Sequence, residues 1–135
     1  MKTEQFIYYL DDDTDDLYIF KEIAESLGHK VSIFINGNEM LRALNKKDQL
    51  PDIIFLDIRM PVFNGEEILH IIKKTDASKH IPVVMISGHN PKSLVRHYLE
   101  AGANYLMKKP SAVTEFKPAL KQILDIDWDR FQAYA

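Results

Sequence analysis

The sequence predicts an α/β domain with a doubly wound, five-stranded parallel sheet, and three observations lead to this prediction. Short apolar runs of strand length alternate with longer segments in which apolar residues recur at helical spacing. Glycine, proline and asparagine mark the boundaries between these segments. The 135 residues, 46% of them hydrophobic, are enough for one domain with a single buried core. Strands that alternate with helices form βαβ units, which place a parallel sheet between two layers of helices.

The apolar runs set the expected order of the strands. Strands are predicted at 6–10, 31–35, 53–56, 81–86 and 104–107. The first, third and fourth runs are almost wholly apolar, as expected of strands that are buried on both faces. The second contains Ser32 and the fifth begins with Asn104, so these two are placed at the edges. With right-handed crossovers, the order is 2-1-3-4-5 when the strands are counted along the chain, which is a flavodoxin-like topology.

The segments between the runs carry signals for helix ends. Asn90 and Pro91 are expected to begin one helix, with the asparagine as N-cap and the proline at the first helical position. Gly102 is expected to end it. The last helix is predicted from about Thr114 to Leu124, which puts Pro118 close to its first turn, where a proline costs little.

Composition excludes several classes of protein. The formal net charge is −3 and no basic stripe is present, so no nucleic-acid surface is expected. The chain has no cysteine, which removes disulfides, thiolate metal sites and thiol nucleophiles. No apolar run is long enough to span a membrane, and the first residues do not form a signal peptide, so a cytoplasmic protein is expected. We predict a single domain over 1–135, with its core at about 5–124 and a C-terminal tail at 125–135.

Polar side chains follow the carboxyl ends of the central strands. These side chains are Asp11, Asp12 and Asp13 after the first strand, Asp57 after the third, Ser87 after the fourth and Lys109 after the fifth. In open parallel sheets this edge binds ligands. Clustered carboxylates repel one another unless a cation neutralises them, and Mg²⁺ prefers oxygen ligands. Together with a lysine and a hydroxyl, this combination suits phosphoryl transfer, in which an aspartate can be the nucleophile.

Six stretches carry a resemblance to a known family. They are Tyr8–Asp13, Ile53–Pro61, Asn64–Gly65, Val84–Gly88, Ala101–Tyr105 and Lys109–Pro110. In this order, over about residues 5–124, the chain resembles the receiver domain of a two-component response regulator, of the single-domain, chemotaxis-receiver type.

The resemblance implies a phosphoacceptor site and its metal ligands. Asp57 would accept a phosphoryl group from a histidine kinase or a phosphotransfer protein. Mg²⁺ would be held by Asp12 directly, by Asp11 through water, by Asp57 and by the backbone carbonyl of Arg59. The protein would thus be a switch that assists its own phosphorylation and dephosphorylation, not an enzyme.

The resemblance also assigns the remaining site residues. Ser87 would hydrogen-bond the phosphoryl group after a small shift, and Lys109 would pair with the phosphoryl oxygens. The Lys109–Pro110 peptide bond would be cis. Output would pass to a partner protein through the face formed by the helix after Asn90, the strand at 104–107 and the last helix. The family usually has an aromatic residue three positions before the lysine, but here that position is Leu106 and Tyr105 precedes it.

Three alternatives compete with this interpretation. An Asp-nucleophile phosphatase would use Asp11 and Asp13 and would leave Asp57 unexplained. A calcium loop starting at Asp11 would require glycine where Asp16 stands. A flavin carrier lacks its phosphate loop after the first strand. For Asp13, Asp15 and Asp16 we expect a helix N-terminus, with Asp13 as N-cap and the other two favoured by the helix dipole.

Overall fold

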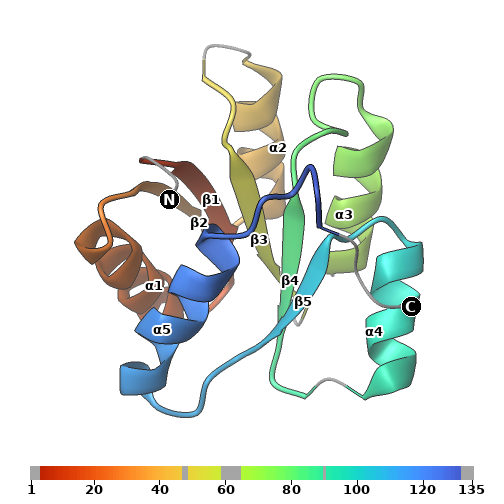
Figure 1. Cartoon of the computed structure of the whole chain (residues 1–135). Helices are drawn as coiled ribbons and strands as arrows, with labels where there is room; N and C mark the ends of the chain where they lie inside the picture. The colour runs from red at the N-terminus through yellow and green to blue at the C-terminus, as the bar shows by residue number, and fades with distance from the viewer. Residues whose placement is uncertain (1–3, 47–48, 59–64, 90, 132–135) are drawn as a thin grey trace.

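The computed structural model describes residues 4–46, 49–58, 65–89 and 91–131, and in these ranges five strands alternate with five helices (Figure 1). The strands are β1 (Phe6–Leu10), β2 (Lys30–Phe34), β3 (Ile53–Asp57), β4 (Val83–Ser87) and β5 (Tyr105–Lys108). The helices are α1 (Thr14–Ser26), α2 (Gly37–Asn45), α3 (Gly65–Lys74), α4 (Lys92–Glu100) and α5 (Val113–Leu124).

The strands form one parallel sheet in the order β2-β1-β3-β4-β5, which confirms the predicted topology. Its register brings the ends of the central strands level with one another. Leu10 pairs with Leu56, and Asp57 pairs with Ile86. The residues that follow β1 and β4 therefore lie beside the end of β3.

Helices cover both faces of the sheet, and each face has its own hydrophobic core (Figure 1). On one face α1 and α5 pack against alternate strand residues such as Tyr9 and Phe55. On the other face α2, α3 and α4 pack against the intervening residues such as Leu10 and Leu56. The period of two along a strand divides the strand side chains between the two cores.

Some element boundaries differ from those predicted. β4 begins at Val83 and not at Ile81, because Pro82 has no amide hydrogen and the Val83 amide bonds instead to the side chain of Asn104. Pro91 is the N-cap of α4 and not its first helical residue. Asn90, the predicted N-cap, lies outside the described residues. Pro118 is the sixth residue of α5, deeper in the helix than predicted.

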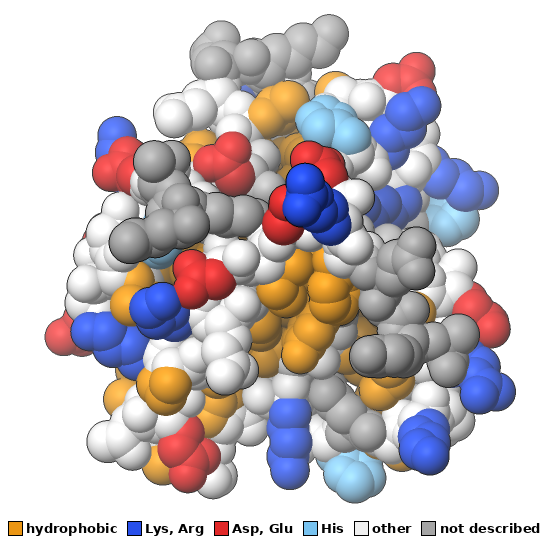
Figure 2. Space-filling model, viewed as in Figure 1, with side chains coloured by type: hydrophobic (Ala, Val, Ile, Leu, Met, Phe, Trp, Pro, Cys, Tyr) orange, Lys and Arg blue, Asp and Glu red, His pale blue; other side chains and the backbone are white. Residues whose placement is uncertain are grey.

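The segment after α5 folds back across β5. The ring of Tyr105 lies 6.5 Å from that of Trp128 and 5.8 Å from that of Phe131, measured between centroids. Figure 2 shows hydrophobic side chains gathered in the middle of this face, beside β5. Part of the tail thus packs on the domain.

Within the described ranges, the structure contains no helix of the length and apolar character needed to span a membrane.

Candidate functional site

Three carboxylates meet at the carboxyl edge of the sheet. Oxygen atoms of Asp11, Asp12 and Asp57 all lie within 4.8 Å of one another. Asp11 and Asp12 directly follow β1, and Asp57 is the last residue of β3, so the β1–β3 register produces the cluster. Asp11 is buried, Asp57 is partly buried and Asp12 is exposed. Three carboxylates at this spacing, open to solvent on one side, are a suitable ligand set for a hard divalent cation.

Asp11 is held in place by hydrogen bonds to both of its oxygens. The hydroxyl of Tyr9 donates to Oδ2 at 2.5 Å, and the amide of Asp13 donates to Oδ1 at 3.0 Å. Tyr9 and Asp11 are both fully buried. Burial, followed by the nearby carboxylate of Asp11, raises the pKa of Tyr9, so its hydroxyl keeps its proton and remains a donor. This role of Tyr9 was not predicted from the sequence.

Asp12 lies beside another carboxylate, which affects its protonation. Desolvation, followed by the neighbouring carboxylate of Asp11, raises the pKa of Asp12. Both causes disfavour the charged carboxylate, and a cation bound beside it would favour the charged form.

Lys109 reaches this cluster from the end of β5. Its amide donates to the carbonyl of Ser87 at 2.7 Å, which fixes the backbone beside β4. Its Nζ lies 3.6 Å from Oδ2 of Asp11 and forms a hydrogen-bonded ion pair with Asp16 of α1. Burial alone would lower the pKa of Lys109, but Asp16, Asp11 and Asp57 together raise it above its ordinary value. The ammonium is therefore charged, and its hydrogen-bond partner is Asp16, for which we expected only an interaction with the helix dipole.

Ser87 ends β4 with its hydroxyl bonded locally. Its Oγ donates to the carbonyl of His89 at 2.8 Å and accepts from the amide of the same residue at 3.2 Å. Ser87 also lines a hollow of about 430 Å³ together with Ile58 and residues of α4.

The backbone on either side of the site bears on two expectations. The Lys109–Pro110 peptide bond is trans, so the cis bond expected from the resemblance is wrong for this structure. The trans isomer is also the one that X–Pro bonds generally favour. Arg59, whose carbonyl was expected to bind the metal, lies outside the described residues.

The structure also bears on the alternatives based on Asp13. Oδ1 of Asp13 accepts from the amides of Asp15 and Asp16 at 2.9 and 3.2 Å, so this side chain caps α1 as predicted. Among the described residues, the group of carboxylates that could hold a metal includes Asp57 and not Asp13. Because α1 begins at Thr14, the twelve-residue calcium loop is not formed either.

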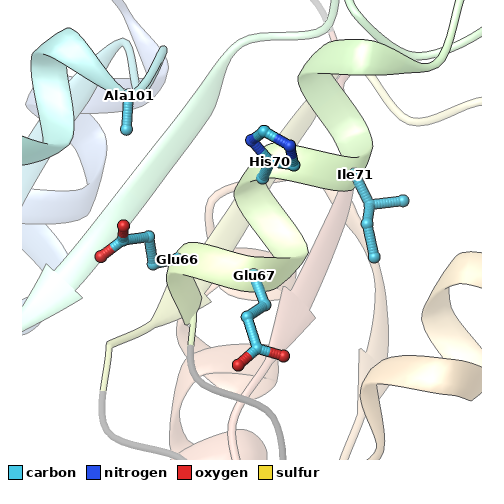
Figure 3. Close-up of a pocket in the computed structure, with 5 residues that line it drawn as sticks. All are labelled: Glu66, Glu67, His70, Ile71 and Ala101. Atoms are coloured by element: carbon cyan, nitrogen blue, oxygen red, sulfur yellow. The ribbon is translucent and has the colours of Figure 1, made fainter.

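A second hollow, of about 610 Å³, lies between α3 and the end of α4. Figure 3 shows its lining, with Glu66 and His70 among the side chains from α3 and Ala101 opposite them. Glu66 already contacts Nε2 of His97 at 2.7 Å. The hollow includes no member of the acidic cluster.

Comparison with known proteins shows the family of this chain. The family model of the response regulator receiver domain matches residues 7–121. The chain therefore belongs to this family, whose members are phosphoacceptor switches and not typical enzymes.

Two curated relatives illustrate the range of the family. The polar-differentiation response regulator DivK of Brucella anthropi is 25% identical over 118 residues, which cover 87% of this chain and 94% of DivK. The transcriptional regulatory protein PrrA of Mycobacterium leprae is 32% identical over 118 residues, which cover 87% of this chain but 49% of PrrA. The chain thus spans nearly all of one relative and about half of the other.

Solved structures confirm the fold. The phosphorylated cyanobacterial phytochrome response regulator RcpA superimposes with a TM-score of 0.81 at 23% identity, over 97% of this chain and 98% of RcpA.

Proposed function

We propose that Asp57 accepts a phosphoryl group from the phosphohistidine of a histidine kinase or phosphotransfer protein, in a reaction that requires Mg²⁺. The observation that carries this proposal is the meeting of Asp11, Asp12 and Asp57 at one edge of the sheet, with the ammonium of Lys109 beside Asp11. This arrangement supports phosphoryl transfer, in which positioning and charge neutralisation supply nearly all of the catalysis.

In the proposed step a carboxylate oxygen of Asp57 attacks phosphorus while the bond from phosphorus to the donor's imidazole nitrogen breaks. The leaving nitrogen keeps the electron pair of that bond, and the product is an aspartyl phosphate. Asp11, Asp12 and Asp57 would hold the metal, with the Arg59 carbonyl as a further predicted ligand. Bound Mg²⁺ supplies positive charge against the carboxylates and the phosphoryl oxygens. Lys109, which follows β5 at the same edge of the sheet, would pair with those oxygens.

The proposed output is a change in the face formed by α4, β5 and α5. Ser87 would leave the carbonyl of His89 and turn toward the phosphoryl group, which shifts the balance between two existing states of that face. Leu106 occupies the usual place of the aromatic switch residue and packs on the side of α3 and α4, whereas Tyr105 packs on the side of α5. A partner protein would read this face.

Intact-mass analysis tests the proposal. The protein is incubated with Mg²⁺ and acetyl phosphate, and a single phosphoryl adduct is expected. Asp57→Asn should abolish the adduct, whereas Asp13→Asn, which changes the α1 cap, should retain it. An adduct that persists in Asp57→Asn and disappears in Asp11→Asn would contradict the proposal and favour the phosphatase class.

A further inference from the structure

Lys109 has two negatively charged neighbours that compete for one ammonium. It forms its hydrogen bond with Asp16, in the first turn of α1, and lies 3.6 Å from Oδ2 of Asp11. The side chains of Lys109 and Asp16 are 28% and 27% exposed, so the pair is substantially shielded from solvent. Shielding makes an ion pair of this kind stronger than one on the open surface.

Asp16 stands apart from the group that could hold a metal. Among the described residues that group consists of Asp11, Asp12 and Asp57. Asp16 also differs from its neighbour Asp15, which is exposed. In the described part of the chain, the side chain of Asp16 forms its hydrogen-bonded ion pair with the ammonium of Lys109.

We propose that Asp16 is a positioning residue that holds Lys109 while Asp57 is unmodified and competes with the phosphoryl group for it. This inference rests on the proposed function of Asp57. When a phosphoryl group arrives on Asp57, Lys109 must share or leave Asp16 to reach the new oxygens. The carboxylate of Asp16 then loses its counter-charge, so Asp16 favours the unmodified state and weakens phosphoryl binding.

The alternative is that Asp16 only complements the dipole of α1. In that case its removal changes stability and has no selective effect on phosphoryl binding. Asp15 provides a matched control, because it stands in the same helical turn and carries the same charge. Asp16→Glu provides a second control, because it keeps the carboxylate within reach of Lys109.

The experiment measures the affinity of the protein for beryllofluoride, a phosphoryl mimic, by calorimetry in the presence of Mg²⁺. Asp16→Asn is expected to bind about threefold to tenfold more tightly than the unsubstituted protein. Asp15→Asn and Asp16→Glu should stay close to the unsubstituted protein. Thermal unfolding of each variant checks that the fold is intact.

Each outcome decides between the two readings. If Asp16→Asn binds no more tightly than Asp15→Asn, or if Asp16→Glu matches Asp16→Asn, the competition is disproved. The proposed function is judged separately, by whether the unsubstituted protein acquires an acetyl-phosphate adduct that Asp57→Asn lacks. If that adduct does not form, the proposed function fails and the role of Asp16 fails with it.

Discussion

At the scale of single residues, removal of the Tyr9 hydroxyl tests how the acidic cluster is stabilised. Tyr9→Phe removes the donor that lies 2.5 Å from Oδ2 of the buried Asp11. The loss leaves a buried carboxylate with one partner fewer, so we expect the free energy of unfolding to fall by about 1–3 kcal/mol. The fall should be smaller with saturating Mg²⁺, because the positive charge of the bound cation stabilises the Asp11 carboxylate that has lost its hydrogen bond. Urea unfolding with and without Mg²⁺ measures both effects.

Tyr8→Phe is the control for this prediction. Tyr8 is also buried, but its ring packs against Phe6 and Phe34 on the other side of the sheet. A loss in Tyr9→Phe that equals the loss in Tyr8→Phe, with no dependence on Mg²⁺, would mean that the Tyr9–Asp11 hydrogen bond does not stabilise the cluster.

At the scale of elements, the start of α3 fixes the end of β3. Gly65 is buried, and a Cβ there would lie 2.8 Å from the carbonyl oxygen of Asp57 and 2.9 Å from Cε of Met85. The carbonyl oxygen of Asp57 can move away from this Cβ only if the end of β3 moves. We therefore expect Gly65→Ala to lower the free energy of unfolding by about 1–3 kcal/mol. Because Asp57 moves with its backbone, phosphorylation by acetyl phosphate should also slow.

Gly88→Ala provides the comparison for Gly65→Ala. A Cβ at Gly88 meets no atom within 4 Å, although this glycine also lies near the site, directly after Ser87. Denaturant unfolding and the rate of adduct formation should separate the two variants. Equal stability and equal rates would show that close packing at Gly65 does not position Asp57.

At the scale of the whole molecule, the pattern of apolar runs was sufficient to predict the topology. Strands buried on both faces are recognised by their composition, and the polar residues Ser32 and Asn104 placed the two edge strands correctly. The meeting of Asp11, Asp12 and Asp57 followed from that topology, because the ends of neighbouring parallel strands are level.

The contacts of Tyr9 and Asp16 were harder to predict, since they depend on side-chain direction. Tyr9 and Asp11 are two residues apart on an extended chain and therefore share a face, which is a signal available in the sequence. Asp16 lies one helical turn before the buried Phe20, which turns it inward, but its partner Lys109 is 93 residues away. No local sequence pattern predicts that this face of α1 lies against the end of β5.

Lys73 links parts of the molecule far from the acidic cluster. Its Nζ donates to the carbonyl of Ile81 at 2.7 Å and to Oδ1 of Asn104 at 3.1 Å. It thereby ties the end of α3 to the segments that precede β4 and β5. Burial lowers the pKa of Lys73 from 10.5 to about 8. In the folded protein the ammonium of Lys73 is therefore partly desolvated, and the free-energy cost of this desolvation depends on pH.

Global stability should show this dependence. Between about pH 8 and 10.5 the unfolded chain binds more protons at Lys73 than the folded chain does, so the contribution of Lys73 to stability rises with pH. Across this pH range, the free energy of unfolding of the unsubstituted protein should rise by about 1–2 kcal/mol relative to that of Lys73→Met, after allowance for partial exposure. Urea unfolding at several pH values measures the difference. Lys74→Met removes the same charge from the exposed neighbour. If the free energy of unfolding rises with pH by the same amount relative to Lys74→Met, the pH dependence does not come from Lys73.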